Sequence, residues 1–145
     1  MVGEGGEIEK VKKYIYENKM ENNVSLIVGG NPAQVLSKSV VFLSLQLHEN
    51  YPSRSLLEAM SCANAVVATN VGYTYLLVDD GNGVLVDQDP QNIARQVYKL
   101  LRSSSLGNKM NESRKRITSK YTKDKYLNNL FSMYKKSCSQ KYTTI

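Results

Sequence analysis

The sequence predicts an α/β fold, in which a parallel sheet is flanked by helices and followed by a helical C-terminal end. Three observations support this prediction. Short apolar runs recur up to residue 86, segments with helical periodicity separate them, and only helical patterns follow residue 90. A chain of 145 residues with 41% hydrophobic and 22% charged residues suffices for one globular domain with one core.

The first third of the chain alternates helix and strand signals. Met1 and Val2 precede the glycine-containing turn 3–6, as the last residues of a buried strand would, so we expect the start of the domain to be truncated. Apolar residues at helical spacing predict an amphipathic helix over 7–20 and a short helix over 33–37. Two short apolar runs are predicted to be buried parallel strands: 24–28 and 40–43.

The middle of the chain continues the alternation. Its predicted elements, in order, are a helix over 53–62, a strand over 65–69, a short helix over 73–78, a turn over 79–83 and a strand over 84–86. Leu56, Leu57 and Met60 are expected on the inward face of the longer helix.

The last third contains helical patterns only. The predicted helices cover 91–102, 106–120 and 123–136. Residues 137–145 carry too little apolar material to pack firmly, so we expect a loose polar tail. The folded domain is therefore predicted to span 1–136.

The net charge of +6 is unevenly distributed, because basic residues gather in the last third of the chain. These residues are Arg102, Lys109, Arg114, Lys115, Arg116, Lys120, Lys123, Lys125, Lys135, Lys136 and Lys141. Such a stretch can favour an anionic membrane surface or nucleic acid, or it can form the solvated face of terminal helices. We expect a solvated face, with peripheral membrane contact as the alternative and no specific nucleic-acid partner.

Features that the sequence lacks bear on the cellular location of the protein and on whether it binds a metal. The apolar stretches fall far short of the roughly 20 residues that cross a bilayer, and no cationic-then-apolar leader opens the chain. Cys62 and Cys138 show neither CxxC nor Cys/His spacing, so no disulfide framework and no metal site is predicted. We expect a soluble cytoplasmic protein.

Residues 48–60 form the segment that is richest in chemistry. It runs from a predicted strand through a polar loop directly into a helix, and ligands of open α/β sheets bind at such strand ends. Ser53 is a candidate N-cap, which leaves the backbone amides near Arg54 and Ser55 free to bind a phosphate. The loop, with Tyr51 and Pro52, is a candidate diphosphate cradle.

Glu58 lies just over one turn into this helix. A carboxylate there would repel a phosphate, but it accepts hydrogen bonds well from paired sugar hydroxyls. The same pattern, a serine followed five residues later by a glutamate, is also a common capping and solubility device. Spacing alone leaves both interpretations open.

The amino-acid sequence of this segment also resembles a known motif. Residues 49–60 read Glu-Asn-Tyr-Pro-Ser-Arg-Ser-Leu-Leu-Glu-Ala-Met, which resembles the donor-site motif of glycosyltransferase family 4, a retaining family with the GT-B fold. The resemblance continues at 65–72 and 81–86 in the same order and spacing, and it covers nearly the whole chain. It implies that the sheet is Rossmann-like and belongs to the C-terminal, donor-binding half of a GT-B fold.

The resemblance implies specific roles for the motif residues. In the family, the second glutamate of a Glu-x7-Glu pair binds the nucleotide ribose and the first lies near donor-sugar hydroxyls; the second maps to Glu58. The family spacing places Asn50 at the first position, with Glu49 one residue too far away, so we prefer Asn50 and keep Glu49 as the second choice. Backbone amides over 51–55 would bind the diphosphate.

Two further sets of residues are candidates through the same resemblance. The nucleotide base would lie beside the loop after the first predicted strand, near Leu26, Ile27 and Gly29, although these residues also fit a plain core and turn. The second set follows a predicted strand on the ligand side of the sheet, where it either contributes to the site or caps the short helix. Its members are Thr69, Gly72 and Thr74.

The resemblance also implies what this chain lacks. The family's diphosphate-neutralising Arg and Lys, and its N-terminal acceptor-binding domain, are not expected within these residues, so no complete catalytic set is predicted. The intact enzyme would transfer a hexose from a nucleotide-diphosphate sugar to a hydroxyl acceptor in polysaccharide or glycolipid synthesis, with no cofactor. We expect the chain alone to be inactive.

Alternative functions remain open at this stage. A nucleotide-sugar 2-epimerase resembles the same two-domain architecture, but its characteristic histidine is not evident and His48 is the only histidine here. A non-enzymatic module is the other class, either a receiver-like domain using Asp79 and Asp80 or a basic nucleic-acid binder using the final helices. The two aspartates fit a turn more simply.

Overall fold

The computed structural model describes the backbone of residues 5–141. The chain divides into two compact units, 1–35 and 36–145, and each unit is described by itself. The first contains α1 (Ile8–Glu17), which buries Ile15, and most of α2 (Pro32–Leu36). The extent of the predicted domain, 1–136, stays a prediction.

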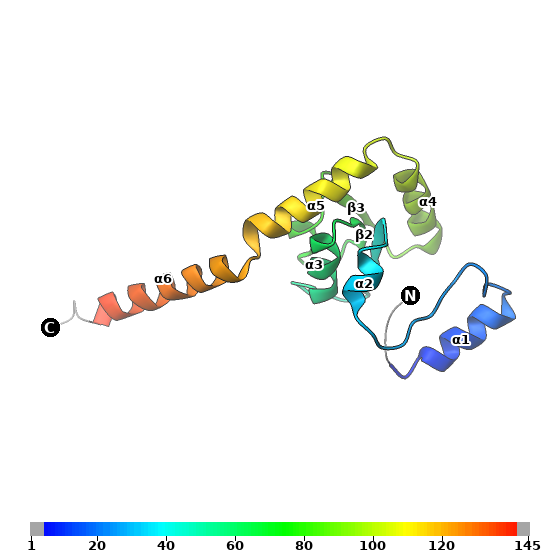
Figure 1. Cartoon of the computed structure of the whole chain (residues 1–145), viewed down its shortest axis with the longest axis horizontal. Coiled ribbons are helices and arrows are strands. Elements are labelled where there is room, and N and C mark those ends of the chain that lie inside the picture. Colours follow the sequence, from blue (N-terminus) through cyan, green and yellow to red (C-terminus); the bar gives the residue numbers. More distant parts are fainter. Residues whose placement is uncertain (1–4, 142–145) are drawn as a thin grey trace. The chain divides into compact units, whose positions relative to one another are not determined.

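The second unit is built on a three-stranded parallel sheet (Figure 1). Its strands are β1 (Val41–Ser44), β2 (Ala65–Thr69) and β3 (Gly83–Val86), in the order β1-β2-β3. Every residue of β2 is buried, because this central strand is covered on both faces. A strand buried on both faces is a continuous apolar run rather than an alternating one, as 65–69 is in the sequence.

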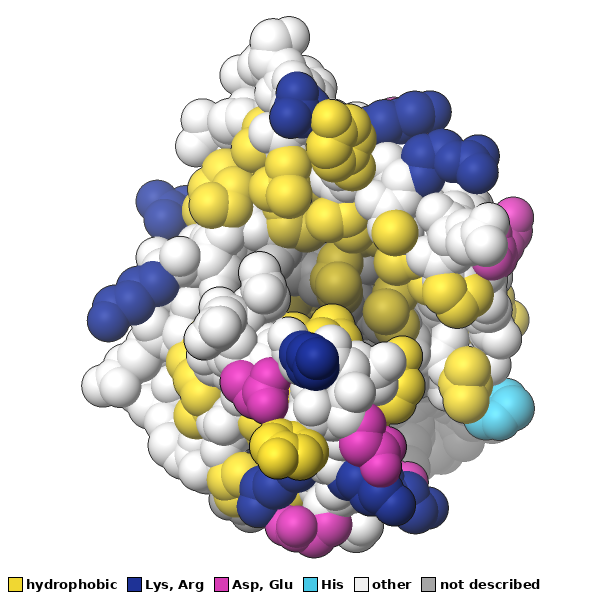
Figure 2. Space-filling view, turned by 90° about the vertical axis from the view of Figure 1, so that its right-hand side faces the viewer, with side chains coloured by type: hydrophobic (Ala, Val, Ile, Leu, Met, Phe, Trp, Pro, Cys, Tyr) yellow, Lys and Arg dark blue, Asp and Glu magenta, His cyan; other side chains and the backbone are white. Residues whose placement is uncertain are grey.

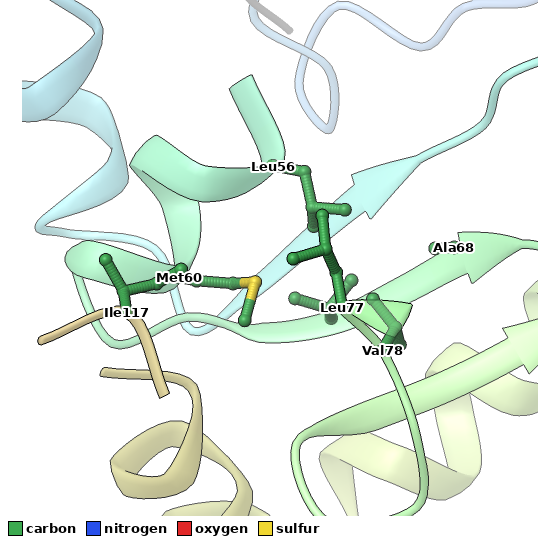
Figure 3. Close-up of a cluster of buried hydrophobic side chains, with 7 residues drawn as sticks. Leu56, Met60, Ala68, Leu77, Val78 and Ile117 are labelled. Carbon is green, nitrogen blue, oxygen red and sulfur yellow. The ribbon is translucent and has the colours of Figure 1, made fainter. Parts of the chain in front are cut away.

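The two faces of β2 pack into two separate cores. Val66 and Ala68 pack with Leu56 and Met60 of α3 (Arg54–Ser61) and with Ile117 of α5 (Leu106–Lys120), as Figure 3 shows for most of this cluster. The opposite face packs against α4 (Pro90–Leu101), with Leu100 at its centre. Truncating one such buried side chain to alanine costs about 2–5 kcal/mol of stability.

Local chemistry explains both ends of α3. Ser53 has an extended backbone, and its hydroxyl accepts a hydrogen bond from the amide of Leu56, which confirms the predicted N-cap. At the other end Ala63 adopts φ 60°, and the amide of Asn64 donates to the carbonyl of Ala59. This left-handed residue closes the helix as a glycine usually does.

The first predicted strand differs from the structure. Within the run 24–28 only Ile27 forms a bridge, and Ile27 and Val28 are 39% and 54% exposed. A short apolar run indicates burial, but it forms a strand only where a partner strand accepts its hydrogen bonds. The strand end predicted at Met1 and Val2 lies outside the described residues.

The last helix is longer than predicted. α6 covers Lys123–Lys141 rather than ending at residue 136, because neither Gly nor Pro interrupts this stretch. Residues 137–141 of the predicted loose tail are thus helical, and the remainder lies outside the described part. No helix in the described part is long and apolar enough to cross a membrane.

The turn before β3 is fixed by an ion pair. Asp79 accepts from the amide of Gly81 at 2.8 Å, and the Arg116 guanidinium donates to its two carboxylate oxygens at 2.9 and 3.1 Å. The hydrogen bonds from Arg116, together with those from the turn amides, lower the pKa of Asp79 from its ordinary value of 3.8. The pair ties α5 to the turn, so Asp79 is a structural turn residue.

The helix end at Ala63 generates a stability prediction. We expect Ala63→Gly to raise the free energy of unfolding by about 0.5–1 kcal/mol. Glycine removes the steric penalty of the left-handed backbone at this position, and the greater conformational entropy of the unfolded chain offsets only part of that gain. Urea denaturation measures the change. Ala94→Gly, in the exposed middle of α4, should instead lower stability by about 1 kcal/mol. A loss of stability in Ala63→Gly would contradict this account of the helix end.

The Asp79 pair generates a pH prediction. A carboxylate whose folded-state pKa is lowered stabilises the protein above its unfolded pKa, and this contribution is lost as the pH falls through the folded pKa. We expect Asp79→Asn to destabilise by less than about 1 kcal/mol near pH 6, since the pair is partly solvated, and by progressively less toward pH 3. Denaturation at several pH values tests this, with Asp80→Asn as the neighbouring control. A difference that grows on acidification would exclude the assignment.

Candidate functional site

The loop that leaves β1 is held in place by the end of β2 and by a residue that follows β3. The buried hydroxyl of Thr69, the last residue of β2, donates to the carbonyl of Gln46 at 2.7 Å and approaches that of Ser44 at 3.4 Å. Beyond β3, the side-chain amide of Gln88 donates to the carbonyl of Leu47 at 3.0 Å. The loop 45–52 therefore starts from a fixed position at the carboxyl edge of the sheet.

The same edge brings the loop after β1 against the loop after β2. Gly72 has φ +50°, and a Cβ built on it would lie 2.5 Å from Cγ of Glu49, so the Glu49 side chain packs directly on this glycine. The rings of Tyr51 and Tyr73 meet edge to face, with centroids 6.2 Å apart. Residues predicted separately from the two loops are thus brought together.

The start of α3 offers two unused backbone donors. The Ser53 hydroxyl lies 3.4 Å from the amide of Leu56 and 3.2 Å from the hydroxyl of Ser55. The amides of Arg54 and Ser55 donate to no acceptor in the part of the chain that the structure describes. Because the helix dipole places partial positive charge at this end, the two amides can bind an anion.

Glu58 is engaged within the protein itself. Its carboxylate accepts from Nε of Arg54 at 2.9 Å, and the two side chains are 41% and 93% exposed. An exposed pair of this kind contributes roughly 0.2–1 kcal/mol, and the order Arg before Glu along a helix is the less favourable one. A ligand that hydrogen-bonds to the carboxylate can therefore displace Arg54 at little cost.

The remaining predicted residues separate by environment. Asn50 is exposed, and it forms no hydrogen bond with any described residue. Thr69 and Thr74 each donate to a backbone carbonyl, Thr74 to that of Val71 at 2.7 Å, which is a scaffold contact. Leu26, Ile27 and Gly29 lie in the first unit, so their role at the base stays a prediction.

Sequence reasoning missed three tyrosines at this edge. Tyr73 and Tyr75 flank Thr74, and Tyr121 follows α5 and lies near Tyr51. Two tyrosines within the three residues after Gly72 were a local signal in the sequence. No local signal could indicate that Tyr121 lies near Tyr51, because the two are 70 residues apart.

Several of the basic residues have internal partners. Arg116 binds Asp79, Lys109 donates to the carbonyls of Asp80 and Gly83, and Arg102 lies over the ring of Tyr98 at 4.6 Å. On the face shown in Figure 2, basic side chains lie apart from one another rather than in one patch. The internal partners of Arg116, Lys109 and Arg102 favour the solvated-face interpretation for these three residues. No group of three or more potential metal ligands is found among the described residues.

Comparison with known proteins extends these observations. The chain is 28% identical over 131 residues to the poly(glycerol-phosphate) alpha-glucosyltransferase of Bacillus subtilis. This match covers 88% of this chain and 19% of that protein. Its fold matches sucrose-phosphate synthase from Thermosynechococcus elongatus with a TM-score of 0.84 at 18% identity, over 96% of this chain and 38% of that one. Anabaena HepE, solved in complex with UDP and glucose, matches with a TM-score of 0.77 at 21% identity, over 94% and 39% of the respective chains.

The chain thus spans well under half the length of these relatives. The structural matches confirm the predicted fold, a parallel sheet flanked by helices as in the C-terminal domain of GT-B glycosyltransferases. The model of the family called glycosyl transferases group 1 matches residues 1–140, and the chain belongs to that family.

Proposed function

We propose that this chain binds a nucleotide-diphosphate sugar and forms the donor half of a retaining hexosyltransferase. The observation that carries the proposal is the pair of free amides at Arg54 and Ser55, with Glu58 one turn behind them. The amides at the helix end can bind an anion and the carboxylate can accept from a diol, and a nucleoside diphosphate carries both groups.

The diphosphate would lie at the start of α3. The free amides and the helix dipole would stabilise its charge in the bound donor and, more strongly, in the leaving diphosphate as the glycosidic bond breaks. Ser53 holds the first turn in this geometry through its buried hydroxyl. Tyr51 and Pro52 directly precede Ser53 in the loop that leads into this turn.

The ribose would displace Arg54 from Glu58. A hydrogen bond from a hydroxyl to a carboxylate contributes roughly 1.5–3 kcal/mol, more than the exposed ion pair that it replaces. The released Arg54 side chain, at the first position of α3, would lie beside the diphosphate and partly neutralise it. Asn50 or Glu49 would bind hydroxyls of the sugar.

A uridine nucleotide is the first donor to test, because HepE was solved with UDP and glucose. The Bacillus subtilis relative is named for glucosylation of poly(glycerol phosphate), which supports a polymer acceptor in polysaccharide or glycolipid synthesis. We propose a cytoplasmic protein whose basic C-terminal helices form a solvated face, with peripheral contact to an anionic membrane surface as the alternative. No cofactor is required for this chemistry.

The role of Glu58 generates a binding prediction. We expect Glu58→Ala to weaken UDP binding about tenfold or more, because the ribose loses a charge-assisted hydrogen bond. Isothermal titration calorimetry, or NMR titration for a millimolar affinity, measures the change. Glu112→Ala is the matched control, since Glu112 is also a half-exposed helical glutamate close to an arginine four residues on, Arg116. Equal UDP affinity in Glu58→Ala and the parent would refute the ribose assignment.

The need for a second domain generates an activity prediction. We expect the purified 145-residue chain to bind donor but to transfer no sugar, because the groups proposed here bind the donor and none binds an acceptor. Incubation with radiolabelled UDP-glucose and poly(glycerol phosphate), with a polymer-precipitation assay, tests this. Label incorporated above that of a heat-denatured sample would show that the chain alone is catalytic.

A further inference from the structure

Three tyrosine rings contact one another in sequence where the two loops meet, and a fourth tyrosine lies near them. The ring of Tyr51 contacts that of Tyr73, whose centroid lies 6.3 Å from that of Tyr75. Tyr121, the residue that follows α5, lies near Tyr51. We call this set, Tyr51, Tyr73, Tyr75 and Tyr121, the tyrosine row. The donor-binding scheme above uses none of its rings.

The tyrosine row has a fixed base. Burial, and then the neighbouring Tyr51, raise the pKa of Tyr121. Tyr73 and Tyr75 are carried by η1 (Thr74–Leu76) and its cap, which the following buried residue Leu77 anchors in the core. A tyrosine has few side-chain torsions to lose, so rings held in this way bind a ligand with little further ordering.

The rings are nevertheless open to solvent. Tyr51, Tyr73 and Tyr75 are 37%, 53% and 52% exposed. Exposed rings on adjoining loops contribute little to the core, and a contiguous aromatic surface of this kind marks an interaction site. The row also continues directly into the loop that carries Glu49 and Asn50.

The polar neighbours of the rings indicate what such a surface would bind. Glu49 packs on Gly72, the residue before Tyr73, and Asn50 precedes Tyr51. A pyranose ring presents C–H groups on its faces, which suit the negative face of an aromatic ring, and hydroxyls around its rim. An amide both donates to and accepts from hydroxyls, and a carboxylate accepts from them. Rings with an acid and an amide beside them match this combination.

We propose that Tyr73 and Tyr75, continued by Tyr51, form a stacking surface for the sugar ring of the bound donor, whose hydroxyls bind Glu49 and Asn50. This inference rests on the proposed function, because the nucleotide at α3 brings the sugar to this edge. The tyrosines select for a pyranose in the donor and add affinity that the nucleotide diphosphate alone does not have.

The test compares each nucleotide sugar with its free nucleotide diphosphate. The probes are UDP-glucose, UDP-N-acetylglucosamine and GDP-mannose, with UDP and GDP, measured by NMR titration and saturation-transfer NMR on the full chain. For the donor that the parent chain binds, we expect Tyr73→Ala and Tyr75→Ala to lower its affinity about two- to tenfold and to leave that of the free diphosphate unchanged. Saturation of the sugar protons should fall while that of the base protons persists.

Two further variants serve as controls. Tyr73→Phe keeps the ring and should bind like the parent. Tyr98→Ala removes an equally exposed tyrosine from α4 and should change nothing. Thermal melts establish that each variant is folded, and Tyr75→Ala tests the surface independently should Tyr73→Ala unfold.

The outcomes distinguish this inference from the proposed function. If both alanine variants bind the nucleotide sugar and the free diphosphate with unchanged affinity, the stacking surface is excluded. The proposed donor site is then not affected. If the affinities for the nucleotide sugar and for the free diphosphate fall equally, the rings contact the base rather than the sugar. This result also excludes the stacking surface. If the parent chain binds none of the five probes, the proposed function fails and the inference fails with it.

Discussion

The hydrogen bond from Thr69 to the carbonyl of Gln46 is the contact on which the geometry of the edge depends. It joins the end of the central strand to the loop that leaves β1, and its donor residue Thr69 is buried. Since β1 and β2 are parallel, their carboxyl ends lie at one edge, and a buried hydroxyl bridging them fixes where the loop begins. The packing of Glu49 on Gly72 and of Tyr51 on Tyr73 follows from that starting point.

The burial of β2 makes such a fixed edge possible. Its side chains alternate between two cores, one under α3 and α5 and one under α4, so the strand is clamped from both faces. Close packing of this kind leaves little freedom to shift. Gly83 shows how tight the sheet is, because a Cβ there would lie 2.3 Å from the backbone oxygen of Val66. The site residues are therefore placed by a rigid core that they do not themselves form.

Local chemistry made part of this structure predictable from the sequence. The N-cap at Ser53, the strand Ala65–Thr69 and the helix Leu106–Lys120 have the boundaries expected from capping residues and hydrophobic pattern. The strand expected at 24–28 was wrong, since the structure has a single bridge at Ile27 there and leaves Ile27 and Val28 exposed.

The candidate site shows the same division between local and long-range information. The free amides of α3 were predictable, because every helix leaves its first amides unpaired. The Arg54–Glu58 pair was also readable from its spacing of four residues, yet the sequence suggested only a ligand for Glu58. The tyrosine row was not predictable, since it joins residues 51, 73, 75 and 121 through the tertiary fold.

Two locally unfavourable features fall at this one edge. A guanidinium at the first position of a helix opposes the helix dipole, and three half-exposed aromatic rings leave apolar surface in water. Neither is needed by the two cores, which are complete without these side chains. An anion at the start of α3 turns the charge of Arg54 from an unfavourable into a favourable one, and a ring with an apolar face covers the tyrosines. The proposed donor, with a diphosphate at one end and a sugar at the other, would relieve both.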